Sequence, residues 1–347
     1  MTVQTHLGTT LPIIQAPMAG VQGSALTIAV SNAGGLGSLA CAMLTPDALL
    51  KELQAIKAGT DRPYNLNFFC HTQPEQSSER EQAWRATLAP YYAEFGIDPE
   101  TIPSAAGRAP FTTATADLIE PFKPPVISFH FGLPDPTLLA RVKAWGTQVL
   151  SSATTVEEAQ WLEAAGVDAV IAQGLEAGGH RGMFLSDDIT TQTGTFALVR
   201  RIVRAVDIPV IAAGGIADAE GVAAAMTLGA AGVQIGTAYL LCPEASTSAV
   251  HRAALQSPDA AHTALTNLFS GRPARSIVNR FIAEMGPLCR AAPAFPLAST
   301  AIAPLRAAAE ALGSGAFSPL WCGQHPPRYA DLDAASLTRA LASMTQS

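Results

Sequence analysis

One histidine stands in a loop that is well suited to chemistry. The segment Gln173–Gly182 reads QGLEAGGHRG and places His180 among glycines, directly after a run of apolar residues. Glycines allow such a loop to fold sharply over a planar ligand. Histidine titrates near neutral pH, so it can act as a general base or, when protonated, hold an anion. The segment therefore predicts that His180 is a catalytic residue.

One other histidine, His130, has a comparable position, because it also ends an apolar run. We interpret His130 as a weaker candidate for binding an anionic substrate. The remaining histidines are interpreted as surface or structural residues: His6, His71, His251, His262 and His325.

Two late glycine-containing loops indicate a phosphate site. Gly214 and Gly215 follow one apolar run, and the sequence Gln234-Ile235-Gly236-Thr237 closes the next. Glycines let backbone amides approach a phosphate closely, and barrel phosphate sites commonly use the loops after strands seven and eight. The alternative is that these glycines only form tight turns. Their occurrence in both loops favours phosphate.

Polar side chains and glycines also gather where the apolar runs end. Buried amides need hydrogen-bond partners, and the edge of a flavin ring would supply them. For any single residue, neighbouring loop backbone is an equally simple partner, but the whole set favours a ligand. These residues are Gln15, Met18, Asn67, His130, Ser151, Gln173, Gly215, Gln234 and Thr237.

The elements that position these residues are short apolar runs that alternate with amphipathic helices. Continuous apolar runs are typical of parallel strands that are covered on both faces. The expected strands are Ile13–Ala16, Gly35–Leu39, Asn65–Phe69, Val126–His130, Gln148–Ser152, Ala169–Gln173, Val210–Gly214 and Val233–Thr237. This alternation predicts an α/β fold, a (β/α)₈ TIM barrel. A doubly wound open sheet is the alternative, but that fold places its glycines in the first βα turn.

Helix boundaries are marked by capping residues. Thr45 before Pro46 predicts a helix start, and Gly59 predicts its end. Thr155 with Glu158 forms a capping-box pattern. Asp218 is expected to cap a further helix.

Two regions interrupt the alternation. Residues 1–242 are expected to form the barrel, with an excursion at about 70–124 that is rich in polar residues and proline. Residues 243–347 are alanine-rich, and we predict a smaller, mainly helical C-terminal lobe packed at the barrel mouth.

Composition excludes several classes of protein. The 347 residues carry a formal net charge of −7 without a clustered basic face, which disfavours nucleic acid as a partner. The five cysteines form no C-x-x-C pair, so neither zinc nor a disulfide framework is expected. The start has no signal-peptide pattern, and no apolar run approaches the roughly 20 residues of a membrane span. We therefore expect a cytoplasmic protein with no membrane association; a homo-oligomer stays open.

The chain resembles the nitronate monooxygenases, formerly called 2-nitropropane dioxygenases. The loop AGGHRG is fairly specific for this family, and the order and spacing of the segments match across essentially the whole chain. The segments that carry the resemblance are Pro12–Gly20, Asn32–Leu39, Asn65–Phe69, Gln173–Gly182, Pro209–Ile216, Gly232–Leu240 and the tail segment Asn267–Phe281.

The resemblance implies non-covalent FMN and an enzyme that oxidises alkyl nitronates with O₂ to carbonyl compounds and nitrite. It places the family's active-site histidine at His180. It also places the flavin contacts at Met18, Asn67, Gln173, Gly178, Gly215, Gln234, Ile235, Gly236 and Thr237. The segment Ala294–Ser299 departs from the family, because Phe295 stands where a tyrosine is usual, and phenylalanine cannot donate a hydrogen bond.

Other functions fit the same barrel. An FMN-dependent NAD(P)H:quinone or enoyl-thioester reductase is the main alternative, since nothing in the sequence excludes it. An enzyme like IMP dehydrogenase would need a cysteine in the loop after strand six, which has none. A non-catalytic flavin-binding sensor and a structural barrel without ligand are the remaining alternatives.

Overall fold

All eight expected strands form and lie in one parallel sheet of the computed structural model, which describes residues 3–104, 108–327, 329 and 332–345. Their order is β1-β9-β8-β6-β5-β4-β3-β2. Strands of this sheet that follow one another along the chain therefore lie side by side. The strands are β1 (Ile13–Gln15), β2 (Gly37–Ala40), β3 (Tyr64–Phe69), β4 (Val126–His130), β5 (Gln148–Ala153), β6 (Ala169–Gln173), β8 (Val210–Ala213) and β9 (Gly232–Ile235).

The sheet closes into a barrel. β1 pairs in parallel with β9 on one side. On its other side, the amide of Gln15 donates to the carbonyl of Leu36 at 3.0 Å, and the amide of Leu36 donates to the carbonyl of Ile13 at 2.8 Å. Leu36 directly precedes β2, so these bonds join the first strand to the second. The predicted (β/α)₈ barrel is confirmed, and an open sheet is excluded.

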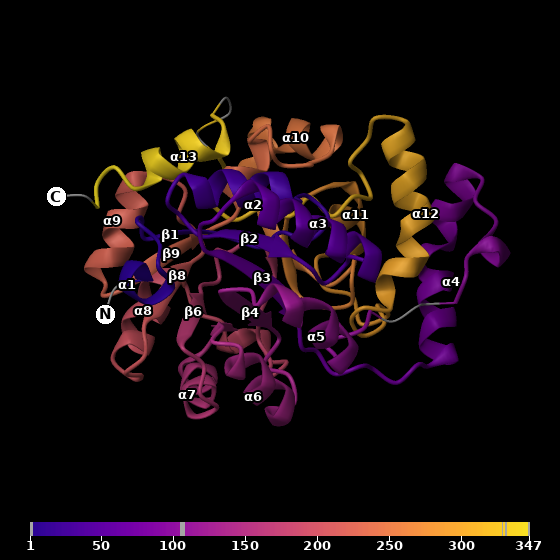
Figure 1. Ribbon diagram of the computed structural model, residues 1–347. Helices are drawn as coiled ribbons and strands as arrows, with labels where there is room; N and C mark the ends of the chain where they lie inside the picture. The colour runs from indigo at the N-terminus through magenta and orange to yellow at the C-terminus, as the bar shows by residue number, and fades with distance from the viewer. Residues whose placement is uncertain (1–2, 105–107, 328, 330–331, 346–347) are drawn as a thin grey trace.

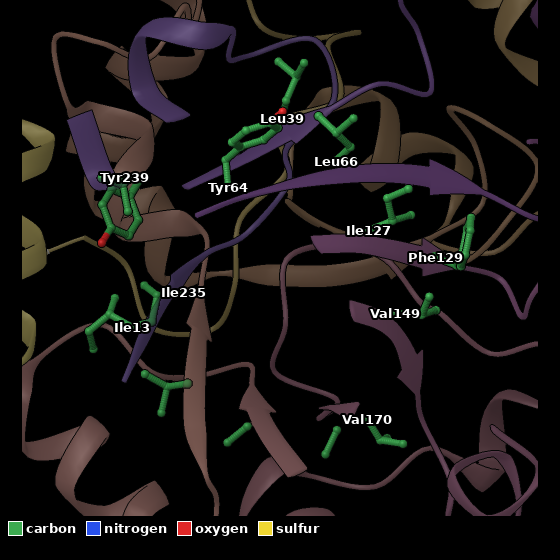
Figure 2. Close-up of a cluster of buried hydrophobic side chains, with 14 of the residues drawn as sticks. Ile13, Leu39, Tyr64, Leu66, Ile127, Phe129, Val149, Val170, Ile235 and Tyr239 are labelled. Carbon is green, nitrogen blue, oxygen red and sulfur yellow. The ribbon is translucent and has the colours of Figure 1, made fainter. Parts of the chain in front are cut away.

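Side chains of the strands alternate between two cores. Figure 2 shows part of the outer core, where strand residues such as Ile13, Ile127 and Val170 pack toward the helices. The intervening residues, among them Ile14, Leu150 and Ile211, fill the barrel interior. Helix α1 (Val3–Leu7) adds its buried residues to this inner cluster, so the interior is a packed core rather than a channel.

Amphipathic helices surround the sheet (Figure 1). They are α2 (Ser24–Asn32), α3 (Pro46–Gly59), α5 (Thr113–Ile119), α6 (Pro136–Ala144), α7 (Val156–Ala164), α8 (Thr195–Val203) and α9 (Ala219–Thr227). Short 3₁₀ turns occur at Pro99–Thr101, Glu120–Phe122, Ile189–Thr191, Thr237–Leu241 and Pro258–Ala261.

The expected caps are present at three helix starts. Thr45, Thr155 and Asp218 each accept a hydrogen bond from a backbone amide in the first turn of the following helix. The capping box is only half formed. The carboxylate of Glu158 instead accepts hydrogen bonds from the amides of Thr154 and Phe184. The second bond connects α7 to the loop after β6.

The excursion after β3 contributes a long helix, α4 (Ser78–Phe95), which lies against α12 (Ala298–Ala311) from the C-terminal segment (Figure 1). Trp84 Nε1 donates to the carbonyl of Ala298, and the Tyr92 hydroxyl donates to the carbonyl of Ala301 at 2.6 Å. A second hydrophobic core joins the two helices. Residues 105–107 of the excursion, and 328, 330–331 and 346–347 of the predicted lobe, lie outside the described residues.

The rest of the C-terminal segment combines helices with strands. It contains α10 (Ala249–Gln256), β10 (Thr263–Thr266), β11 (Ala274–Ile277), α11 (Arg280–Met285) and α13 (Ala334–Leu341). The antiparallel strands β10 and β11 extend to β7 (Gly179–His180), which belongs to the loop after β6. Helix α13 returns to the barrel, where the hydroxyls of Thr338 and Tyr239 lie 2.8 Å apart.

Two absences hold for the part of the chain that the structure describes. No helix there is both long and apolar enough to cross a membrane. No cluster of three or more histidine, cysteine, aspartate or glutamate side chains there could hold a metal ion.

Shortening a side chain in the core between α4 and α12 should destabilise the protein. Leu305 is fully buried in that core, so Leu305→Ala is expected to lower the free energy of unfolding by about 2–5 kcal/mol. Leu312, at the end of the same helix, is 77% exposed, so Leu312→Ala should change it by less than about 0.5 kcal/mol. Urea unfolding measures both values. Equal values for the two variants would show that α4 and α12 do not share a stabilising core.

Candidate active site

A cavity of about 620 Å³ lies at the carboxyl ends of the strands and reaches outward to α10 and α12. Its size suits a small organic ligand. All but one of the predicted site residues line it: Met18, Asn67, His130, Gln173, Gly178, His180, Gly215, Gln234, Gly236 and Thr237.

Ile235 is the exception. Its side chain is 1% exposed and packs in the outer core between barrel and helices (Figure 2). Its carbonyl accepts a hydrogen bond from the amide of Ala16 at 2.8 Å. Alternation along β9 turns the side chain of Ile235 away from the cavity while Gln234 faces it, so a cofactor contact at Ile235 would use its backbone.

Two polar residues at strand ends have structural partners instead of facing the cavity. Gln15 is fully buried and accepts from the amide of Ser38 at 2.9 Å. The Ser151 hydroxyl lies 3.1 Å from the carbonyl of Gly132. For these two positions, the alternative that the side chain satisfies neighbouring backbone is correct.

His180 is held between the barrel and the C-terminal segment. His180 pairs with Ala274 where β7 meets β11. The imidazole Nε2 lies 2.8 Å from the hydroxyl of Ser270, which also lies 3.4 Å from the carbonyl of Arg272. Trp321 and Phe295 flank the ring, each with its centroid 5.3 Å away. The histidine that the glycine-rich loop predicted is thus fixed from several sides at the cavity wall.

The base of the same loop is held by buried side chains. Gln173 donates from Nε2 to the carbonyl of His180 at 2.9 Å and accepts from the amide of Gly182 at 2.8 Å. Arg181 is fully buried, and its guanidinium donates to the carbonyls of Gln173 and Gly174. Gln173 therefore lines the cavity and also sets the shape of the loop.

His130 contacts the loop with both ring nitrogens. Nδ1 lies 3.1 Å from the hydroxyl of Ser152, and Nε2 lies 3.3 Å from the carbonyl of His180. Burial, assisted by the nearby charge of Arg272, lowers the pKa of His130 to about 3. A neutral ring with both nitrogens engaged positions His180, which differs from the substrate-anion contact expected at this residue.

The electrostatic surroundings keep His180 neutral. Burial lowers its pKa well below the usual value, and His130, Arg108 and Arg272 lower it further. A neutral imidazole can accept a proton, or form a hydrogen bond, but it does not bring a charge to an anion. A neutral His180 therefore cannot form an ion pair with an anion.

The ends of β8 and β9 offer features that fit a phosphorylated, planar ligand. Gly214 and Gly215 have φ angles of +111° and +72°, a conformation that favours glycine. The side-chain oxygen Oε1 of Gln234 is buried without a hydrogen-bond partner among the described residues. A buried acceptor of this kind calls for a donor from a ligand. Gly178 has a packing role as well, because a Cβ there would lie 2.6 Å from the amide nitrogen of Gly323.

Several cavity residues were not found from the sequence. His325, which we interpreted as surface or structural, lies with Nδ1 3.3 Å from the carbonyl of Gly215. His251 is buried, and its Nε2 lies 3.1 Å from the carbonyl of Trp321. Arg108, from the excursion, also lines the cavity. None of these has a local sequence signal, since each reaches the cavity through long-range packing.

Comparison with known proteins identifies the group to which the chain is related. A family model described as nitronate monooxygenase matches residues 2–340. A nitronate monooxygenase from Pseudomonas aeruginosa is 45% identical over 343 residues, which cover 96% of this chain and 96% of that protein. The chain belongs to the nitronate monooxygenase family.

Further relatives agree with this assignment. A nitronate monooxygenase from Paraburkholderia phytofirmans is 43% identical and is covered to 92%, with 96% of this chain matched. The structure of a nitroalkane oxidase from Streptomyces ansochromogenes has a TM-score of 0.88 at 39% identity, covering 99% of this chain and 98% of that one. FabK from Thermotoga maritima is more distant, with a TM-score of 0.71 at 26% identity and coverage of 99% and 96%.

Within this nitronate monooxygenase family member, Phe295 belongs to an aromatic wall that also contains Phe69 and Phe131. Its ring centroid lies 4.9 Å from that of His71 and 5.3 Å from that of Phe131. Because His180 also contacts Phe295, the phenylalanine borders the histidine directly. Phe295 thus presents no hydrogen-bond donor beside His180.

The pKa of His130 predicts a pH-dependent stability. The unfolded chain binds a proton here as the pH falls through about 6.5, whereas the folded chain does so only near pH 3. Folding stability should therefore decrease as the pH falls between these values, and His130→Gln should weaken that decrease. Urea unfolding at several pH values measures the effect, and the variant assigns the His130 signals in ¹⁵N–¹H spectra. A His130 ring that titrates near pH 6.5 would contradict the prediction.

Proposed function

We propose that this enzyme binds FMN non-covalently and oxidises alkyl nitronates to carbonyl compounds and nitrite, with O₂ as the electron acceptor. The observation that carries the proposal is the convergence of two glycine loops and a neutral, firmly held His180 on one cavity. Membership of the nitronate monooxygenase family supports the reaction. Bound FMN would supply the chemistry of accepting electrons from the nitronate and passing them to O₂.

The residues present fit FMN. Gly214 and Gly215, with Gly236 and Thr237, border the side of the cavity where the phosphate is expected, because glycine loops let amides approach it. Gln234 lies on the same side and offers its unpaired acceptor Oε1 to a ring N–H. Asn67 on β3 and Gln173 on β6 also line the cavity and complete the proposed polar contacts. Met18, Gly178 and the backbone of Ile235 remain proposed contacts.

His180 can act as the base for a neutral nitroalkane. The Ser270 hydroxyl donates to the carbonyl of Arg272, so its oxygen is able to accept a hydrogen from His180 Nε2. That arrangement leaves Nδ1 as the acceptor of the neutral ring. Nδ1 would then remove the α-proton. An ionised nitronate needs no base, and His180 would only orient it.

Burial keeps the ring of His180 neutral, so Nδ1 carries no proton before the substrate binds. Five free thiols agree with a reducing, cytoplasmic compartment, which we also propose for this enzyme.

Replacing Gln234 should affect the apoprotein and the FMN complex in opposite directions. Gln234→Leu removes a buried acceptor that has no partner among the described residues, so the apoprotein should be at least as stable as the wild type. Loss of the bond to FMN should raise the dissociation constant about two- to tenfold. Urea unfolding of the apoprotein and fluorescence titration with FMN measure the two effects. Gln54→Leu, on the exposed face of α3, is the matched control.

A destabilised apoprotein with unchanged FMN affinity would contradict this placement of Gln234. It would show that the side chain serves the fold rather than the cofactor.

Anaerobic reduction tests the reaction itself. The FMN-loaded protein is mixed with propionate 3-nitronate, with NADH and with NADPH in separate samples, and the flavin absorbance is followed. Rapid bleaching by the nitronate is expected. In steady-state assays, His180→Asn should lower turnover of a neutral nitroalkane by about 10²–10⁴, the usual contribution of a general base. Turnover of the matching nitronate should fall much less, because it requires no proton removal.

Bleaching by NADH or NADPH but not by the nitronate would reject nitronate oxidation and support the FMN-dependent reductase. Bleaching by none of them would support the non-catalytic flavin-binding sensor. Equal losses for nitroalkane and nitronate in His180→Asn would reject the role of base.

A further inference from the structure

We infer that Arg108, from the excursion after β3, is the residue that binds the anionic nitronate group of the substrate, beside His180. The inference rests on the proposed function for the identity of the substrate. It concerns a residue that reaches the cavity from outside the barrel, and it assigns the positive charge that a neutral His180 cannot supply.

Arg108 is placed at the cavity by the excursion. Its side chain lines the cavity together with His180, Phe69 and His130. The backbone at this position is anchored, because His71 Nε2 lies 3.0 Å from the carbonyl of Arg108. A few residues later, the amide of Phe111 donates to the carbonyl of Phe69 at 2.8 Å, at the end of β3. The segment is therefore held at Arg108 and again at Phe111, where it is bonded to the end of β3.

The charge of Arg108 acts on the part of the cavity that contains His180. It lowers the pKa of both His71 and His180, although burial is the larger cause for each. The His71 and His180 rings both contact the Phe295 ring, with centroids 4.9 and 5.3 Å away. The guanidinium thus lies near the reacting group rather than at the outer end of the cavity.

Nothing acidic neutralises this charge. Among the described residues, Arg108 forms no ion pair with a carboxylate, and burial lowers the pKa of its guanidinium. The Arg108 side chain is half-buried at the cavity wall, so its guanidinium is accessible from the cavity and can bind an anion there. An anionic ligand in the cavity would neutralise that charge.

Arg272 strengthens the positive potential from behind the cavity wall. Its guanidinium stacks on Phe131, with Cζ 4.2 Å from the ring centroid, and donates to the carbonyl of Met183. It also lowers the pKa of His130 and His180. The acids that act on Arg272, Asp187 and Glu158, form no ion pair with it within the described part of the chain. Arg272 is held by the protein, whereas Arg108 faces the ligand.

Position separates Arg108 from the proposed phosphate site of FMN. The glycines expected at the phosphate follow β8 and β9. Arg108 lies instead beside the ends of β3 and β4, next to Phe69 of the aromatic wall. A planar guanidinium presents paired donors that match the two oxygens of a nitronate or of nitrite. The ligand class is therefore a small, planar oxyanion.

The test measures binding of nitrite, an anion of this shape, to the FMN-loaded protein by calorimetry. Arg108→Gln should raise the dissociation constant of nitrite about tenfold or more, because a charge-assisted contact is lost. Arg108→Lys should restore part of the affinity. Arg306→Gln is the matched control, since Arg306 lines the outer part of the same cavity and is paired with Glu310 at 2.8 Å.

A second measurement separates anion binding from a general defect. In Arg108→Gln, KM for an alkyl nitronate should rise by a similar factor, while KM for the corresponding neutral nitroalkane should stay near the wild-type value. If the enzyme does not oxidise nitronates at all, the nitrite titration still decides the role of Arg108, so the two proposals fail separately.

Two results would overturn the inference. One is an unchanged affinity for nitrite in Arg108→Gln, with wild-type FMN affinity showing that the variant is folded. The other is a loss of FMN affinity in place of nitrite affinity, which would assign the guanidinium to the cofactor.

Discussion

The active site depends on the pairing of β7 with β11. This short antiparallel contact joins the loop after β6 to the C-terminal segment, and it contains His180 itself. The carbonyl of His180 faces Gln173 and His130 from the barrel, while its imidazole reaches Ser270 from the C-terminal segment. Neither part of the chain would fix the histidine alone. The barrel and the C-terminal segment must therefore both be in place before the catalytic geometry exists.

The packing of the C-terminal segment against the barrel also explains the electrostatics of the cavity. Packing the C-terminal segment and the excursion over the strand ends buries His130 and His180 and brings Arg108 and Arg272 close to them. Burial and positive neighbours both disfavour an imidazolium, so the histidines stay neutral. The same neighbours favour an anionic ligand. The proposed proton transfer at His180 and the anion binding inferred for Arg108 therefore fall to different side chains, and neither depends on His180 being charged.

Local patterns predicted the barrel because its strands and caps are encoded locally. Continuous apolar runs and residues such as Thr45 and Asp218 marked the elements correctly, and the glycine-rich loop pointed to His180. Closure and the contacts across the site are long-range. Trp84 meets Ala298 across 214 positions, and Arg108 lies in a segment without periodicity. The resemblance named Ile235 as a cofactor contact, and only the structure shows that its side chain packs on the outer face of β9.

The phenylalanine at position 295 is consistent with this division of roles. The aromatic wall of Phe69, Phe131 and Phe295 offers apolar surface next to His180. A donor at this position would compete with Arg108 for the oxygens of an anion, whereas a phenyl ring only packs against the carbon atoms. Polar groups reappear farther out, where Ser299, Arg306 and Glu310 line the cavity. The inner end of the cavity is thus bordered by aromatic rings and His180, whereas the outer part is lined by charged and hydroxyl side chains.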